Sequence, residues 1–426
     1  MPATKGKDEV RLDDVLTELG LTNASAALAP EWELSQAAIP EGDLWLLVPE
    51  FVRGACAELG APEQVAQAAV RVAERMAASE SLCALAWHLR YRLYQTKTAG
   101  WDDVCGWPTL EACLGGDAGL FYLILVVSNL PQMKEVHQAH RVPENVIRDT
   151  LRDFDFWTDN GGESPGLTPV NAAWLSNHLR GDIYRLGRLQ FQFAPCQYDL
   201  RVFRHRASRA VLALARDGTR YNAAGQRDAS GKDPDGWTAR LTITDEAIVG
   251  CPILPVGRAL AREVLLPPAE WETVLTKGDP VLNIHIPGGA PLAHDLCGRS
   301  LRQAFEFFPR HFPDRPFVAV CCGSWILNTW LETALPPASN LVRFQREFYL
   351  FPIPLSPEWL LRNVFGAVPE DLTKAPRDTQ LRRALLDRLA SGQPIPTGGG
   401  GCLMLPEDFR WGEQVYRSQQ LPFGLS

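Results

Sequence analysis

Two polar residues, Asn283 and His285, interrupt an apolar stretch that has the pattern of a β-strand. The stretch reads DPVLNIHIP over residues 279–287. Because strand side chains alternate between the two faces, Asn283 and His285 share one face. A histidine at the carboxyl end of a central strand can act as a general base near neutral pH. The alternative is a buried histidine that is hydrogen-bonded to a backbone group, and the pattern alone leaves both interpretations open.

Cys322 and Ser324 stand at similar positions in the next predicted strand, RPFVAVCCGSWIL (315–327). They share a face of that strand by the same alternation. A cysteine near a histidine can form a nucleophilic pair, so Cys322 and His285 are one candidate for an acyl-enzyme site. The alternative is a small residue that fills the core of the sheet, as free cysteines commonly do. The motif G-x-S-x-G is absent, so nothing indicates the nucleophile turn of an α/β-hydrolase.

The segment between these strands has the features of an anion-binding site. Gly288 and Gly289 follow the first strand, and a helix is predicted at 292–312 directly afterwards. Glycines let backbone N–H groups approach an anion, and the first turn of a helix offers unpaired donors. Arg299 and Arg302 lie early on this helix and can pair with phosphate oxygens. The alternative is an ordinary Gly-Gly turn that joins a strand to a helix.

No pattern in the sequence indicates a metal site. The pair of histidines in HQAH (137–140) has no third ligand at a suitable spacing and is expected at a solvated helix end. The run of four glycines at 398–401 lacks the Lys-Ser/Thr of a phosphate-binding loop, and we expect a turn there. The ten cysteines form no CxxC pair. They are therefore expected to be reduced thiols of a cytoplasmic protein.

Composition limits the classes of protein that the chain can belong to. The 426 residues are 46% hydrophobic and 22% charged, as in soluble globular proteins. The net charge of -8 argues against nucleic acid as a partner, because phosphate neutralisation needs a basic surface. The first residues lack the apolar core of a signal peptide. The longest apolar run, Leu120 to Val127, is far short of the ~20 residues of a membrane span and predicts a buried helix or strand.

Elements that must position these residues can be assigned from periodicity. Residues 9–155 are predicted to be helical, and the clearest break is WTDNGGESPGLTP (157–169). We therefore expect a helical domain over 1–156 and a second domain over 157–426. The second part reads as several strands, the first at 183–193, followed by strand–loop–helix–strand–helix–strand. This order indicates antiparallel strands that lead into a βαβ unit, and hence a mixed sheet.

The segment 282–348 resembles a family of bacterial acyltransferase-domain proteins. The resemblance rests on IHIPGG (284–289) and SNLVRFQREF (339–348), with support from LGRLQF (186–191) and from 365–389. In that family a helical N-acyltransferase N-terminal domain precedes a GNAT-like C-terminal domain. The resemblance thus implies an α+β fold, in which the helical domain is followed by a mixed, mainly antiparallel sheet flanked by helices.

The resemblance also implies an activity and a set of roles. In a GNAT fold two adjacent parallel strands splay apart, and the pantetheine arm of an acyl-CoA co-substrate lies in the gap. Here Val281–Pro287 and Phe317–Leu327 would be these strands, and Cys322 would line the gap. An amine of a small-molecule acceptor would attack the thioester directly, with His285 as the base. The remaining roles implied are Asn283 and Ser324 in the catalytic group, and Pro287, Gly288, Gly289 and Ala290 in the pyrophosphate loop.

Two departures from the GNAT pattern keep a second function open. The loop reads PGGAPL instead of Arg/Gln-x-x-Gly-x-Gly/Ala, and no Tyr lies between Ser324 and Glu347 to protonate the leaving thiolate. The alternative to an enzyme is therefore a catalytically silent module that binds acyl-CoA or a nucleotide-like ligand. We also expect the helical half to contribute to the acceptor site, with aromatic residues near the break, Trp157, Trp174 and Tyr184, as candidates for its lining.

Overall fold

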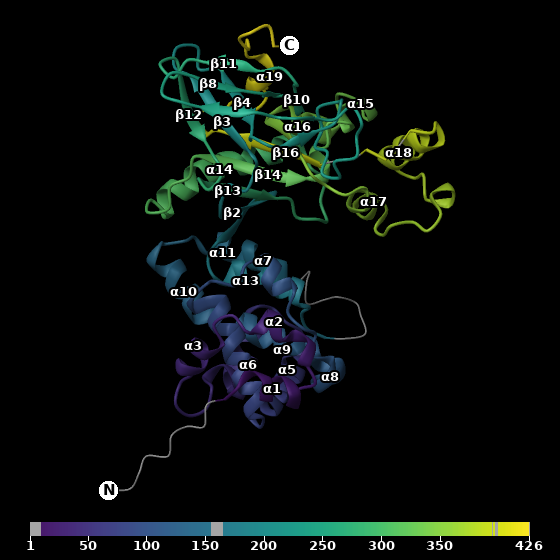
Figure 1. Ribbon diagram of the computed structural model, residues 1–426. Coiled ribbons are helices and arrows are strands. Elements are labelled where there is room, and N and C mark those ends of the chain that lie inside the picture. The colour runs from purple at the N-terminus through teal and green to yellow at the C-terminus, as the bar shows by residue number, and fades with distance from the viewer. Residues whose placement is uncertain (1–9, 155–164, 394, 397–398, 426) are drawn as a thin grey trace. The chain divides into compact units, whose positions relative to one another are not determined.

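The computed structural model describes residues 10–154, 165–393, 395–396 and 399–425. The chain forms two compact units, Met1–Arg185 (unit 1) and Leu186–Ser426 (unit 2). The division falls later than the predicted boundary at 156/157. The reason is helix α13 (Pro169–Leu179), which Thr168 caps and whose apolar side chains are buried in the core of unit 1. Figure 1 traces both units.

The described residues of unit 1 that precede β1 (Ile183–Leu186) fold into helices, as the periodicity predicts. Its helices are α1 (Leu12–Glu18), η1 (Thr22–Ala24), α2 (Ser25–Leu28), α3 (Trp32–Ala37), η2 (Trp45–Leu47), α4 (Pro49–Glu58), α5 (Glu63–Ala77), α6 (Glu80–Arg90), η3 (Tyr91–Gln95), α7 (Trp101–Cys105), α8 (Glu111–Leu114), η4 (Gly115–Asp117), α9 (Ala118–Val127), α10 (Leu130–Ala139), α11 (Glu144–Leu151) and α13. The predicted apolar run forms α9. By length and composition Glu111–Ala139 could cross a membrane, but 72% of its most apolar window is buried inside the structure. This stretch therefore forms core of unit 1.

Unit 2 is built around a six-stranded sheet with the strand order β1-β2-β13-β14-β16-β15. These strands are β1 (Ile183–Leu186), β2 (Leu189–Pro195), β13 (Pro280–His285), β14 (Ala319–Ser324), β15 (Tyr349–Ile353) and β16 (Gly399–Met404). The predicted strand at 183–193 is in fact two strands, because Gly187 has a φ of 69° and turns the chain between them. Strands β13 and β14 pair in parallel and their neighbours pair antiparallel, so the predicted fold of a mixed, mainly antiparallel sheet is confirmed.

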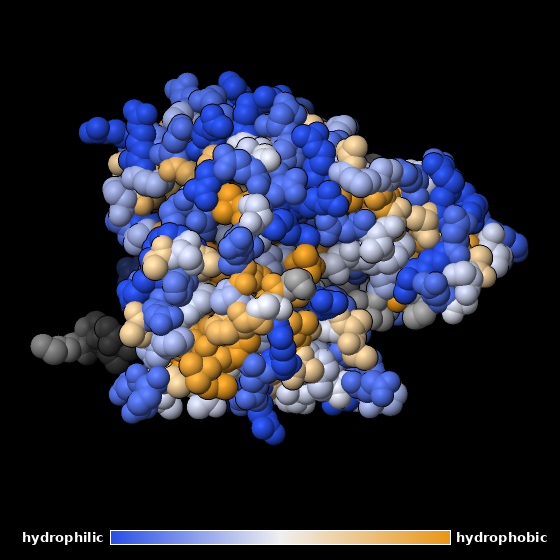
Figure 2. All heavy atoms as spheres, turned by 90° about the horizontal axis from the view of Figure 1, so that it is seen from above, coloured by the Kyte–Doolittle hydropathy of each residue, from blue (hydrophilic) through white to orange (hydrophobic). Residues whose placement is uncertain are grey.

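Three smaller sheets complete the strands of unit 2. The first has the order β10-β9-β4-β3-β12, the second β11-β8-β7 and the third β5-β6. Their strands are β3 (Leu200–His205), β4 (Val211–Ala215), β5 (Arg220–Tyr221), β6 (Trp237–Thr238), β7 (Leu241–Ile243), β8 (Ile248–Gly250), β9 (Pro252–Leu254), β10 (Arg258–Ala259), β11 (Val264–Leu266) and β12 (Trp271–Leu275). Figure 2 shows a largely hydrophilic face of the molecule that carries a hydrophobic patch.

The helices of unit 2 come after β13 in the chain. They are α14 (His294–His311), η5 (Trp325–Leu327), α15 (Leu331–Ala334), α16 (Asn340–Arg346), α17 (Pro357–Phe365), η6 (Leu372–Lys374), α18 (Gln380–Ala390), η7 (Pro406–Asp408) and α19 (Val415–Ser418). Helix α14 covers the apolar face of the sheet, where Phe308 contacts the rings of Phe191 and Phe193 on β2. The other face of β2 and β13 is left for polar side chains.

The glycine run near the carboxyl terminus is not the predicted turn but the start of β16, between β14 and β15. A Cβ atom at Gly400 would lie 1.6 Å from the carbonyl oxygen of Leu327, and one at Gly401 would lie 2.1 Å from the ring of Phe351. Glycine is required here because the protein's own atoms fill the space that a side chain would take. Gly398 lies outside the described residues.

Candidate active site

Strands β13 and β14 separate at their carboxyl ends. Their parallel register runs from Val281 beside Ala319 to Asn283 beside Cys321 and then stops. Beyond that point β13 still pairs with β2 as far as His285, and β14 still pairs with β16 as far as Ser324. Each strand therefore follows its outer neighbour, and the ladder between β13 and β14 opens beyond Asn283. This geometry is the splay expected from the family resemblance.

The polar face of β13 faces the same way as two glutamines of β2. Asn283 lies opposite Gln192 in the antiparallel register, and His285 lies opposite Gln190. The Nε2 atom of His285 is 2.8 Å from Oε1 of Gln192. An amide oxygen only accepts hydrogen bonds, so Nε2 is the donor in this contact, which fixes the ring of His285 on the polar face.

The structure does not bring Cys322 to His285. Residues side by side in a parallel ladder share a face, so Cys321, and not Cys322, lies on the face of Asn283 and His285. Cys322 points to the opposite face, where it stands across from Cys402 of β16. The hypothesis of a Cys322–His285 nucleophilic pair is therefore not supported by the register of the sheet.

Ser324 also lies on the face away from Asn283. Its Oγ accepts a hydrogen bond from the backbone N–H of Ile326 at 3.4 Å and caps η5. Of the three predicted catalytic residues, the structure thus brings together Asn283 and His285 and leaves Ser324 in a local structural role.

The predicted pyrophosphate loop is open to solvent at its two glycines. Gly288 and Gly289 are exposed, and no atom lies within 4 Å of the position that a Cβ would take on either one. Two further loop residues are held by Arg188, which donates to the carbonyl oxygen of Ala290 at 2.7 Å and to that of Pro291 at 2.9 Å. Arg188 was not a candidate from sequence, since it lies about 100 positions upstream of the loop.

The two predicted phosphate-binding arginines lie past the first turn of α14. The helix begins at His294, so Arg299 and Arg302 are in its second and third turns. Arg299 forms an ion pair with Asp295 at 3.1 Å, and its side chain is 62% exposed. Arg302 is exposed as well. Their role in phosphate binding stays a prediction.

A tyrosine that sequence analysis missed lies over Gly323 near the carboxyl end of β14. The hydroxyl oxygen of Tyr198, in the segment between β2 and β3, lies 3.1 Å from the position that a Cβ of Gly323 would take. Gly323 is two residues past Cys321 and shares its face. Burial raises the pKa of Tyr198 above its usual value, so the phenol stays neutral and can donate a hydrogen bond. The family pattern directs attention to 324–347, whereas Tyr198 comes from a segment that precedes both splayed strands.

The aromatic residues expected to line an acceptor cleft have other surroundings. Tyr184 is fully buried in unit 1, where its ring contacts His137. Trp174 donates a hydrogen bond from Nε1 to Asp153 at 3.0 Å. Trp157 lies outside the described residues. The contribution of the helical half to an acceptor site therefore stays a prediction.

His137 itself corrects the expectation of a solvated helix end. It is buried, and burial lowers its pKa to about 4. In the part of the chain that the structure describes, no group of three or more His, Cys, Asp or Glu side chains is placed to hold a metal ion.

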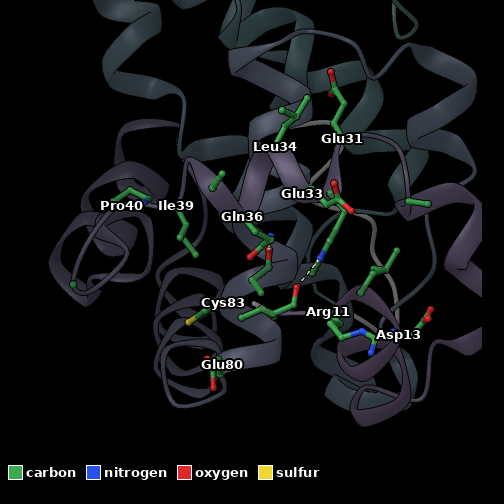
Figure 3. Close-up of a pocket in the computed structure, with 17 residues that line it drawn as sticks. Arg11, Asp13, Glu31, Glu33, Leu34, Gln36, Ile39, Pro40, Glu80 and Cys83 are labelled. Carbon is green, nitrogen blue, oxygen red and sulfur yellow. Dashed lines mark hydrogen bonds between the residues drawn. The ribbon is translucent and has the colours of Figure 1, made fainter. Parts of the chain in front are cut away.

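Unit 1 contains a hollow of about 1510 Å³ between the starts of α1, α3 and α6. Figure 3 shows carboxylates around it, including Asp13, Glu31, Glu33 and Glu80, with Arg11 as a basic neighbour. The carboxylate of Glu31 accepts hydrogen bonds from Thr96 and Thr98. These hydrogen bonds hold the Glu31 carboxylate in place within unit 1, and they do not identify a ligand for the hollow.

Comparisons with known proteins agree with this architecture. Residues 183–402 match the model of the GNAT-like C-terminal domain, and residues 50–181 match that of the N-acyltransferase N-terminal domain. The chain belongs to the family of acyltransferase proteins that carry these two domains. No curated protein matches the chain.

Solved structures of similar fold include several acyltransferase complexes. One is in complex with CoA and 10C-teicoplanin (21% identity, 91% of this chain and 98% of that chain covered, TM-score 0.59). Another is in complex with decanoyl-CoA and teicoplanin (22% identity, 92% and 98% covered, TM-score 0.57). A third is a mutant in complex with octanoyl-CoA (22% identity, 91% and 98% covered, TM-score 0.57). At these identities the likeness shows a shared fold over nearly the whole chain.

Proposed function

We propose that this protein is a CoA-dependent N-acyltransferase that moves an acyl group from acyl-CoA to an amine of a small-molecule acceptor. The observation that carries the proposal is the separation of β13 from β14 beyond Asn283, with His285 at the end of the polar face. Membership in the N-acyltransferase and GNAT-like family supports it. The acyl-CoA complexes among the structural neighbours support it as well.

The reaction is a direct transfer. The acceptor amine attacks the thioester carbonyl carbon, a C–N bond forms, and the amine proton passes to His285, directly or through water. Backbone N–H groups at the end of β13 stabilise the oxyanion of the tetrahedral intermediate. The C–S bond then breaks, and the products are an amide and CoA.

Tyr198 donates a hydrogen bond that stabilises the leaving thiolate, which then takes up a proton from water. Its hydroxyl lies over Gly323 near the carboxyl end of β14, and burial keeps the phenol neutral. A hydrogen-bond donor at this position supports an enzyme over the catalytically silent module.

The acyl-CoA is bound with its pyrophosphate against Pro287, Gly288, Gly289 and Ala290. The exposed glycines leave their backbone accessible to phosphate oxygens, and the start of α14 adds its dipole. The predicted role of Cys322 in lining the pantetheine gap is not part of the proposal, because its thiol lies on the face of β14 away from His285. The acceptor is an amine-bearing small molecule, and the teicoplanin bound by two structural neighbours makes that compound the first one to test.

The test is turnover by the full-length protein. Acetyl-, octanoyl- and decanoyl-CoA are each incubated with a panel of amines that includes teicoplanin, free thiol is detected, and the product is identified by mass spectrometry. Acceptor-dependent release of CoA with an amide product supports the proposal. Tight binding of acyl-CoA without turnover of any acceptor supports the silent module instead. Absence of CoA binding contradicts both.

A further inference from the structure

A buried hydrogen-bond network surrounds the first residue of α14, where the proposed pyrophosphate loop enters the helix. His294 is only 8% exposed, and its Nε2 lies 2.8 Å from Oε1 of Glu347. The other carboxylate oxygen of Glu347 accepts the backbone N–H of Gly412 at 2.8 Å. The carboxylate is thus held on both oxygens, and it fixes one edge of the His294 ring.

The other ring nitrogen of His294 faces two donors. Its Nδ1 lies 3.0 Å from Nη2 of Arg343 and 3.3 Å from Nε1 of Trp411. Guanidinium and indole groups donate hydrogen bonds and accept none, so Nδ1 must be the acceptor. The ring is therefore neutral, with its proton on Nε2 toward Glu347. A single tautomer aligns the whole network.

Packing holds this arrangement in place. Nε1 of Trp411 also lies 3.0 Å from the backbone carbonyl oxygen of His294, and the two rings are 4.8 Å apart. A Cβ on Gly298 would lie 2.4 Å from the indole, so Trp411 rests directly on the backbone of α14. The network is therefore anchored directly to the backbone of α14.

The exposed end of the network is a positive charge without a counter-ion. Arg343 is exposed, and among the residues that the structure describes its guanidinium forms no ion pair. Its neighbours differ in this respect, because Arg346 pairs with Glu332 at 2.7 Å and Arg299 pairs with Asp295. The network therefore ends in an exposed guanidinium that no described carboxylate contacts, which leaves the group able to bind an anion from outside.

We propose that Arg343 binds the pyrophosphate of CoA and that His294 is a positioning residue that holds the guanidinium at the first turn of α14. This inference rests on the proposed function and adds a binding residue that lies on a different helix from Arg299 and Arg302. Two N–H groups of a guanidinium can contact a phosphate in parallel, which makes the contact both strong and directional.

The experiment measures the affinity of the full-length protein for CoA and for dephospho-CoA by calorimetry. Arg343→Gln is expected to weaken both ligands by the same factor, about 10- to 100-fold, because charge-assisted hydrogen bonds to the shared pyrophosphate are lost. The KM for acyl-CoA should rise while kcat changes little, because the lost contact binds the ground state and the transition state equally. Weakening of CoA alone would mean that Arg343 contacts the 3′-phosphate, which overturns the assignment.

Controls separate this inference from the proposed function. Arg310→Gln removes the same charge from the last turn of α14, about 24 Å along the helix from His294, and should leave both affinities unchanged. His294→Phe keeps an aromatic ring but removes the hydrogen-bond acceptor. As a single change it should lower the affinity for CoA about 3- to 10-fold, and it should cause no further loss when combined with Arg343→Gln. If the wild type binds CoA and Arg343→Gln binds it equally well, only the inference fails. If the wild type binds no CoA, the proposed function fails.

Discussion

The two glycine runs of unit 2 look alike in sequence and differ in what approaches their backbone. At Gly288 and Gly289 no atom lies within 4 Å of the position that a Cβ would take, so the space beside the loop is open. At Gly400 and Gly401 the same space is filled by the protein itself, by the carbonyl group of Leu327 and the ring of Phe351. One run leaves its backbone accessible to a ligand, and the other lets three segments of the chain pack closely.

The difference shows what a glycine pattern can and cannot indicate. Both runs signal that the backbone must be approached closely. Only the fold decides whether the approaching group is a ligand or another part of the chain. A larger residue in place of a glycine should therefore lower the stability of the protein in β16, and the affinity for the ligand in the loop at 288–289.

Gly400→Ala should have the largest effect, on folding itself. Its methyl group would overlap the carbonyl group of Leu327 at 1.6 Å, and backbone cannot move aside as a side chain can. We expect a loss of about 3 kcal/mol or more in the free energy of unfolding, at or above the usual cost of overpacking. Denaturant unfolding of purified protein measures it.

The matched control is Gly54→Ala, in helix α4, where no atom lies within 4 Å of the added methyl group. This change should leave stability unchanged or raise it by about 0.5–1 kcal/mol, because alanine favours helix. If both variants unfold at the same denaturant concentration, the packing explanation for β16 is wrong.

Gly289→Val should weaken CoA binding by about 100-fold, through loss of several backbone contacts to phosphate. The branched side chain blocks the approach to the loop, and because Gly289 has a φ of 80° the change also strains the backbone locally. Calorimetry with CoA measures the effect. Gly218→Val is the control, since Gly218 has a similar φ of 76° against 80° and also lies in open space. Equal CoA affinity in Gly289→Val and the wild type would remove the loop assignment.

Gly323→Ala is an intermediate case, where the added methyl group would lie 3.1 Å from the hydroxyl of Tyr198. The tyrosine must shift by a few tenths of an ångström, and we expect kcat to fall about 10-fold, which corresponds to the loss of about 1.4 kcal/mol from one displaced hydrogen bond. Tyr198→Phe should lower kcat further, and Gly323→Ala should add nothing in that background. Additive losses in the double variant would show that Gly323 acts independently of Tyr198.

Cys322→Ala should have the smallest effect. The thiol is on the face of β14 away from His285, so transfer rates should stay within about 3-fold of the wild type. Intact-mass spectrometry during turnover should show no acyl adduct on the protein. An adduct that disappears in Cys322→Ala would establish the acyl-enzyme route instead.

Much of this site could be predicted from sequence because its main chain is continuous. The strand with Asn283 and His285, the loop at 287–290 and the following helix are adjacent in the chain, and each has a local pattern. The splay was expected from the family resemblance, and the register that ends at Asn283 beside Cys321 matches it.

The rest depends on contacts between distant segments. A shift of one residue in register exchanges the faces of Cys321 and Cys322, and no local pattern fixes it. Tyr198, Arg188 and Trp411 reach the site from elements far away in sequence. The turn predicted for the glycine run was wrong for the same reason, since the segments that pack on β16 are not visible in its own sequence.

The central claim is direct transfer with His285 as the base, and kcat of His285→Ala tests it most directly. With acyl-CoA and acceptor both saturating, we predict a decrease of about 10²–10⁴-fold, while the affinity for CoA stays that of the wild type because the loop is untouched. Full activity in His285→Ala would contradict the assignment of the base.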